Sequence, residues 1–127
     1  MTVVAVDPAD ATPIYAQLDR GLRAAIAARR LRPGDQLPTV RQLAIDLKIN
    51  ANTVARVYGE LERAGVIETR RGVGSFIAAS PDVARPPDER RRRLEAFATR
   101  VLAEAAAAGF TIDDVRDAIA SHETKGA

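Results

Sequence analysis

This chain of 127 residues lacks or nearly lacks several residue types, and each shortage excludes a class of function. It has no cysteine, which excludes disulfides, zinc–thiolate sites and thiol nucleophiles. Its one histidine, His122, cannot form a multi-histidine metal site and provides no basis for a conventional His-based triad. We therefore expect no metal, no required cofactor and no enzyme activity.

Long apolar runs are also missing. No run approaches the roughly 20 residues of a membrane span, and residues 1–10 lack the basic start of a signal peptide. These absences predict a cytoplasmic protein with no membrane insertion. Aromatic residues form only 4% of the chain although 46% of it is hydrophobic, so we expect a helical core of small and aliphatic side chains. The length allows one domain, or a small domain with an appendage.

The net charge of +2 is unevenly distributed along the chain. Residues 1–12 contribute −2 and residues 80–127 contribute −1. Residues 13–79 carry 11 basic and 6 acidic side chains, a net charge of +5. The positive charge is therefore concentrated in the middle, which makes nucleic acid a candidate partner for that segment.

The central segment begins with the periodicity of two helices. Leucine or isoleucine recurs every fourth residue from Ile14 to Ile26, which predicts a first helix that ends near Arg30. After a turn, Thr39 begins the capping-box sequence Thr-Val-Arg-Gln, in which two backbone donors at a helix start are satisfied reciprocally. We therefore expect a second helix to start at Thr39.

A third helix is expected from its N-cap, Asn50, to about Ala64, and only two residues separate it from the second helix. Two strand-like runs follow at 66–69 and 75–78, joined by the hairpin sequence Arg70-Arg71-Gly72-Val73-Gly74. Two helices on a tight turn followed by a hairpin form the pattern of a winged helix-turn-helix. The expected fold is mainly α with a small β-wing.

The third helix begins with side chains that suit DNA. In this motif its N-terminal residues lie at the base edges of the major groove, and here they are Asn50-Ala51-Asn52-Thr53. Asparagine can bond adenine through two hydrogen bonds, threonine can contact the thymine methyl, and arginine can pair with guanine or a phosphate. Two residues also have structural explanations, since Asn50 suits a helix cap and Arg56 suits a solvated helix face.

The hairpin adds a second candidate contact. Arg70 and Arg71 can bind phosphates, while Gly72 and Gly74 let the backbone approach a DNA strand closely. The Gly-Val-Gly sequence is also found in nucleotide-binding loops, but between two strands and without a following helix it indicates a turn.

Together these sequences resemble the DNA-binding domain of GntR-family bacterial transcription regulators. The resemblance covers residues 13–78, just over half of the chain. The Asn-x-Asn-Thr-Val and Thr-Arg-Arg-Gly-x-Gly runs, with a short C-terminal part, are similar to the YtrA-type subfamily. The matching stretches are Pro13-Ile14-Tyr15-Ala16-Gln17-Leu18, residues 31–38, Val40-Arg41-Gln42-Leu43-Ala44, residues 50–54, residues 58–62 and residues 69–76.

The resemblance implies a homodimeric repressor that binds a palindromic operator in double-stranded DNA. It implies contacts by Arg41 in the second helix and by the Arg71-Gly72 region of the wing. Lys48 stands where many relatives have glycine. A lysine at a position that needs a left-handed backbone predicts mild strain or a slightly different turn. Ala51 replaces an arginine of other subfamilies. The expected DNA-binding residues are Thr39, Arg41, Asn50, Ala51, Asn52, Thr53, Arg56, Arg70, Arg71, Gly72 and Gly74.

Two further helices are expected after a proline-containing linker. Gly109 ends the first helix and Thr111 caps the second, so the short spacer predicts a helical hairpin. Two short helices cannot close a core alone. They could fold back on the winged domain, but the linker prolines favour packing against a second subunit. The expected dimer interface consists of Leu94, Phe97, Val101, Leu102, Phe110, Ile112, Val115 and Ile119.

The expected organisation has four parts: an N-terminal tail at 1–12, a winged helix-turn-helix domain at 13–79, a linker at 80–87 and a dimerisation hairpin at 88–123. The run Arg90–Arg93 fits a solvated helix face, and it also fits a contact with a phosphate or with an acidic patch on the partner subunit.

Two other functions are considered, and the identity of any small-molecule effector is left open. A winged helix used for protein or RNA contact is the alternative, and it predicts exposed apolar residues or stacking aromatics on the third helix. The other rival is an enzyme, since some family relatives carry an aminotransferase-like domain after the winged domain. Here only 48 residues follow Ala79, and their one lysine is Lys125, so we expect no pyridoxal-phosphate pocket and no such activity. A dedicated ligand pocket of about 300–1,000 Å³ exceeds what the C-terminal part can enclose, so any small-molecule effector, of unknown identity, would bind at an interface.

Overall fold

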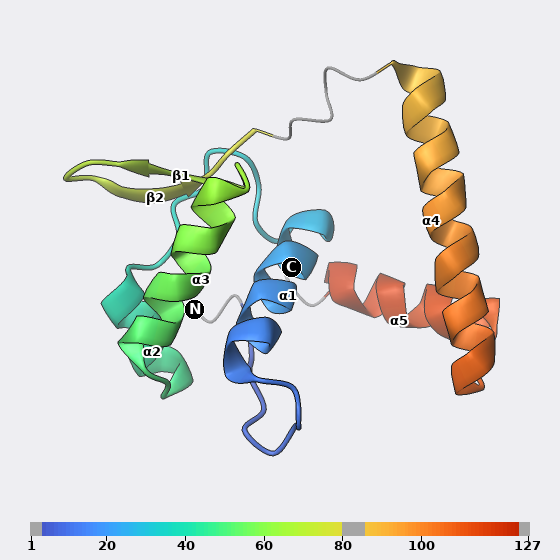
Figure 1. Ribbon diagram of the computed structural model, residues 1–127, viewed down its shortest axis with the longest axis horizontal. Helices are drawn as coiled ribbons and strands as arrows, with labels where there is room; N and C mark the ends of the chain where they lie inside the picture. Colours follow the sequence, from blue (N-terminus) through green and yellow to red (C-terminus); the bar gives the residue numbers. More distant parts are fainter. Residues whose placement is uncertain (1–3, 80–85, 125–127) are drawn as a thin grey trace. The chain divides into compact units, whose positions relative to one another are not determined.

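The computed structural model describes residues 4–79 and 86–124. The described residues form two compact units, one of residues 4–79 and one of residues 86–124. The described part is mainly α with a small β-wing, as the sequence predicts (Figure 1). Its elements are α1 (Ile14–Ala27), α2 (Val40–Leu47), α3 (Ala51–Arg63), β1 (Ile67–Arg70), β2 (Gly74–Ile77), α4 (Pro87–Ala108) and α5 (Ile112–Thr124).

The first unit has a closed apolar core among α1, α2 and α3. The four-residue spacing in α1 buries Leu18 and Leu22 completely or nearly so. The helix ends at Ala27, three residues before the predicted end, because Arg29 adopts a left-handed conformation with φ of 63°. The largest fully buried side chains are Leu18, Leu22, Leu43, Val54, Val57 and Leu61, which come from all three helices.

The segment before α1, expected as a tail, packs on the helix from residue 4 onward. Val4 is buried and lies so close to Gly21 that a Cβ on that glycine would be 2.0 Å from Val4 Cγ2. The Gln17 side chain accepts a hydrogen bond from the Asp7 backbone N–H at 2.7 Å and donates to the Thr12 carbonyl at 2.8 Å. Residues 4–12 therefore belong to the winged unit.

The turn between α2 and α3 has the strain that the sequence predicts. Thr39 and Gln42 form the complete capping box at the start of α2. Lys48 ends the helix at φ 57° and ψ 47°, in the left-handed region that L-residues other than asparagine and aspartate seldom adopt. Asn50 then caps α3, and this tight connection fixes the direction in which α3 leaves the turn.

The wing has two antiparallel strands and a third bridging segment. Residues pair from Ile67 with Ile77 to Arg70 with Gly74, one residue out of step with the predicted strand limits. The segment before α2 joins the other edge of β2, since the Leu37 N–H donates to the Ser75 carbonyl at 2.8 Å. The loop after α1 thus braces the wing against the helices.

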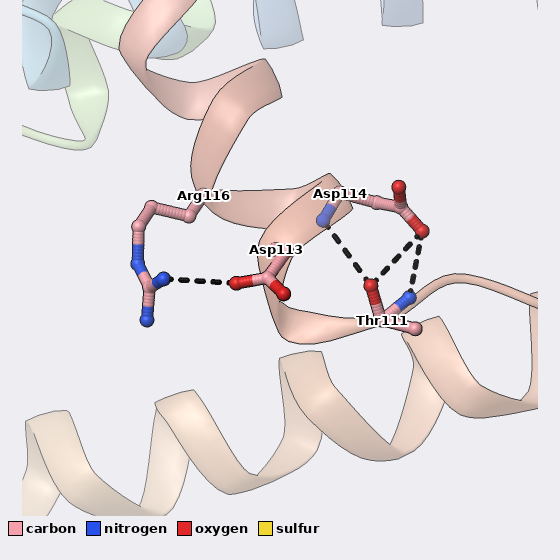
Figure 2. A network of polar contacts seen from close by, with 4 residues as sticks. All are labelled: Thr111, Asp113, Asp114 and Arg116. Carbon is pink, nitrogen blue, oxygen red and sulfur yellow. Dashed lines mark hydrogen bonds and ion pairs between the residues drawn. The ribbon is translucent and has the colours of Figure 1, made fainter.

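The second unit consists of α4 and α5. Gly109 ends α4 at φ 87°. Figure 2 shows that Thr111 and Asp114 cap α5 reciprocally: the Thr111 N–H donates to Asp114 Oδ2 at 2.9 Å, and the Asp114 N–H donates to Thr111 Oγ1 at 3.4 Å. After this turn α5 leads away from α4 near the C-terminal end of that helix (Figure 1), so the two helices are joined by the predicted short turn but α5 does not fold back along α4 as expected. Ala105 is the buried residue of α4.

Candidate nucleic-acid interface

The first turn of α3 presents small and polar groups to solvent. Ala51 and Asn52 are exposed, and Thr53 is half-buried. This turn, all of it within the described chain, has no acidic residue. Because the first N–H groups of a helix carry a partial positive charge, the end of α3 favours an anion such as a phosphate.

Asn50, a predicted DNA-binding residue, is the N-cap of α3. Its Oδ1 accepts a hydrogen bond from the Asn52 backbone N–H at 2.8 Å, so the capping interpretation of Asn50 is confirmed. Only the backbone of Asn52 takes part in that bond, and among residues 4–79 and 86–124 its side chain has no hydrogen-bond partner. The Asn50 side-chain oxygen is thus engaged in the cap, while Asn52 is exposed on the first turn of α3.

Two of the predicted arginines are exposed and available for contact. Arg41 lies in the first turn of α2 and Arg71 lies at the tip of the wing. Within residues 4–79 and 86–124, no acidic side chain pairs with either guanidinium. Both cations can therefore bind phosphate without first breaking an ion pair in the protein.

The other two predicted arginines already have partners. Arg56 lies 3.9 Å from the centre of the Tyr15 ring, and its Nε is 3.2 Å from Glu60 Oε1. This cation–π contact joins α3 to α1 and supports packing between them. Arg70 likewise lies 4.1 Å from the ring centre of Phe76. The sequence shows neither aromatic partner, because each pair is formed by the fold.

The wing tip depends on a side chain that the sequence patterns do not single out. Gln36 Nε2 donates to the Val73 carbonyl at 3.0 Å, across 37 positions of sequence. A Cβ on Gly74, which has φ of 142°, would lie 2.6 Å from this same Gln36 nitrogen. Gly74 thus makes room for the brace, while Gly72, with φ of 77°, forms the turn. Both predicted glycines shape the wing that carries Arg71.

Tyr58 fixes α3 against the loop before α2. Its hydroxyl donates to the Pro38 carbonyl at 2.7 Å. Burial raises the pKa of Tyr58 to about 12, so the phenol keeps its proton and this hydrogen bond at neutral pH. Thr39 follows Pro38 directly, and its hydroxyl accepts from the Gln42 N–H at 3.1 Å. The loop that leads to Arg41 is thereby held in place.

The residues expected at a dimer interface lie in the second unit and are largely uncovered. Phe97 of α4 is 54% exposed and Ile119 of α5 is 63% exposed. Val101 and Val115 are half-buried. The remaining predicted interface residues are all exposed: Leu94, Leu102, Phe110 and Ile112.

The three-helix core, the exposed start of α3 and the braced β-hairpin define a winged helix-turn-helix protein. Residues 14–77 match the family described as bacterial regulatory proteins of the gntR family. The chain belongs to this family, and its first unit is the DNA-binding domain of a transcriptional regulator.

Two similar proteins are named as HTH-type transcriptional regulators. The HTH-type transcriptional repressor YtrA of Bacillus subtilis is 43% identical over 76 residues, which cover 60% of this chain and 58% of the relative. The uncharacterized HTH-type regulator YhcF of the same species is 44% identical over 82 residues, 65% of each chain. The chain thus spans less than two thirds of the length of these relatives.

A solved structure extends the similarity beyond the winged unit. It is described as YtrA from Sulfolobus acidocaldarius, a GntR-family transcription factor, and it superimposes with a TM-score of 0.58 at 30% identity. The alignment covers 80% of this chain and 98% of that one. In the part of this chain that the structure describes, no helix is long and apolar enough to cross a membrane.

Proposed function

We propose that this protein is a transcriptional repressor that binds a palindromic operator as a homodimer. The observation that carries the proposal is the exposed first turn of α3, with Ala51 and Asn52 in the open and Ala51 lining one groove with Arg41. No acidic side chain among residues 4–79 and 86–124 pairs with Arg41. Such a turn can enter the major groove, and Asn52 has both the donor and the acceptor that adenine requires.

The proposed contacts have two roles: some position the protein on the DNA backbone, and others select the base sequence. Arg41 and Arg71 bind phosphates on either side of the groove and fix the helix in register, and they add affinity that is independent of sequence. Asn52 and Thr53 supply hydrogen-bonding and methyl groups toward the bases. Arg56 and Arg70 support these surfaces through Tyr15 and Phe76, and their phosphate contacts are secondary.

The second unit supports the homodimer through its apolar side chains and its charges. One groove of about 380 Å³ along α4 is lined by apolar and basic residues, among them Phe97 and Arg90. Another groove of about 670 Å³ runs along α5 from the turn before it. It is lined by apolar and acidic residues, among them Ile119 and Asp117. A second copy can cover both surfaces, since the apolar groups need burial and the charges are of opposite sign.

Two-fold symmetry then explains the palindrome. Two copies joined through α4 and α5 present two copies of α3 to half-sites about one helical turn, or 34–36 Å, apart. The repressing direction is supported by the relative from Bacillus subtilis that is named a repressor. The protein acts in the cytoplasm, where the operator is.

The proposal is tested on duplexes that the purified protein selects from a random DNA library. Binding is titrated by fluorescence anisotropy at several salt concentrations, with random duplex and single-stranded RNA as competitors. Preference for a palindromic duplex, bound by one dimer, supports the proposal. Equal binding of RNA, or no preference among duplexes, would favour the winged helix as a module for RNA or protein contact instead.

Two variants separate the roles within the site. Arg71→Ala should weaken binding to every duplex and lower the salt slope by about 1 per subunit, and Arg70→Ala is the matched control with a smaller effect. Asn52→Ala should weaken operator binding by about 1–3 kcal/mol with little effect on random DNA. Equal losses of Asn52→Ala on operator and random duplexes would contradict its role in sequence selection.

A further inference from the structure

An apolar groove lies between α2 and the start of α3, and its lining includes Arg41, the proposed phosphate contact, and Ala51. Ile45, on the outer face of α2, is 68% exposed although the helix buries Leu43 and Ala44 in the core. A single exposed isoleucine is ordinary. Here, however, it borders a shallow groove of about 560 Å³. The groove is lined by Val40, Arg41, Ala44, Ile45, Ile49 and Ala51.

The groove lies beside the proposed base-contacting turn. Ala51 is the first residue of α3, the part of the recognition helix that meets base edges. Arg41 and Ile45 are four residues apart on α2 and therefore share one helix face. The phosphate contact of Arg41 thus brings the apolar wall at Ile45 next to the DNA.

The chemistry of this lining restricts what it can recognise. Ala51, Ile45 and Ile49 have no side-chain donor or acceptor, so they cannot read a base by hydrogen bonding. On the major-groove edge of DNA, the apolar group is the C5-methyl of thymine. An apolar wall that borders base edges therefore distinguishes thymine from the other bases through that methyl.

We propose that this groove is a thymine-selective subsite, in which the C5-methyl of one thymine per half-site packs between Ala51 and the isoleucines 45 and 49. The subsite rests on the proposed function and adds base selection by burial to the hydrogen bonding of Asn52. Arg41, at the groove edge, binds the adjacent phosphate and holds the thymine in register.

The experiment removes the methyl and changes nothing else. Each thymine of the selected operator is replaced in turn by deoxyuridine, and binding is measured by anisotropy. Burial of one methyl contributes about 0.8 kcal/mol, or about fourfold in affinity. One symmetric pair of positions should therefore lose about fifteenfold when both half-sites carry uracil. At that pair, 5-methylcytosine should bind more tightly than cytosine by a similar factor.

Protein variants assign the effect to the groove. Ala51→Ser replaces the apolar surface by a hydroxyl and should abolish the difference between thymine and uracil at that pair. Ile45→Ser should reduce the difference. Ala55→Ser, the same change one turn further along α3 at an exposed residue outside the groove lining, should retain the full difference.

The outcomes separate this inference from the proposed function. If the protein prefers no duplex, the proposed function fails and the subsite fails with it. If it selects an operator but uracil substitution is neutral at every position, only the subsite is overturned. If every uracil-sensitive pair of positions keeps its full sensitivity in Ala51→Ser, no thymine methyl lies in this groove and the subsite is also overturned. A pair that loses its sensitivity only in Thr53→Ser reports the separate contact of Thr53.

Discussion

The winged unit buries its large apolar side chains, whereas the C-terminal unit leaves most of its own exposed. In the winged unit, Leu18, Leu43 and Leu61 from three different helices are completely buried. In the C-terminal unit, Phe97 and Ile119 stay more than half exposed, and α5 leads away from α4 instead of covering it (Figure 1).

This difference shows where each unit obtains its stability. Three helices and a braced sheet surround a common interior in the first unit, so it can fold without a partner. The two helices of the second unit expose large apolar groups that favour association, because each fully buried one contributes about 1.5–3 kcal/mol. The winged unit therefore has its own buried core, whereas the C-terminal unit leaves apolar surface available for the dimer that we propose.

The largest expected effect comes from charging the exposed face of α4. The double variant Leu94→Asp, Phe97→Asp should raise the dimer dissociation constant at least 100-fold, since burial of two such groups is worth about 3–6 kcal/mol. Sedimentation over a range of concentrations measures this change. Arg91→Gln, on the same helix, is the control and should remain dimeric. An unchanged dimer in the double variant would place the interface elsewhere.

A core truncation in the winged unit should act on folding instead. Leu61→Ala is expected to lower the free energy of unfolding of this unit by about 2–5 kcal/mol, because it leaves a cavity at a fully buried position. Urea denaturation measures the loss. Phe97→Ala is the matched control and should leave the unfolding of the winged unit unchanged. Similar losses in both variants would show that the two units fold together.

Sequence patterns that involve only neighbouring residues predict many of the structural features of both units. The capping box at Thr39, the left-handed Lys48 and the helix stop at Gly109 are confirmed, because each depends on local backbone chemistry. The apolar residues that α4 and α5 expose are expected from their helical spacing in the sequence. The predicted DNA-contacting and dimer roles of the side chains stay predictions.

Contacts between distant residues are what the sequence patterns miss. The packing of Val4 on Gly21, the cation–π contact of Arg56 with Tyr15 and the brace from Gln36 to Val73 each join segments with no shared periodicity. These contacts change the interpretation of the site. Arg56 looks free as a member of an exposed helix face, but the fold gives it an aromatic partner on another helix.

The smallest expected effect concerns the turn that sets the direction of α3. Lys48→Gly removes the Cβ at a left-handed position and should raise the free energy of unfolding of the winged unit by about 0.5–1 kcal/mol. Urea denaturation measures the gain, and Lys48→Ala, which removes the charge but keeps the Cβ, should show none. A loss of stability in the glycine variant would mean that the lysine itself contributes contacts at this turn.

We propose that the winged unit folds alone and that the C-terminal unit joins two copies of it. The most direct measurement is light scattering and circular dichroism of the chain truncated after Ser80, beside the full-length protein. We expect a helical, cooperatively unfolding monomer from the truncated chain and a dimer from the full chain. A truncated chain that stays dimeric, or that does not fold, would contradict it.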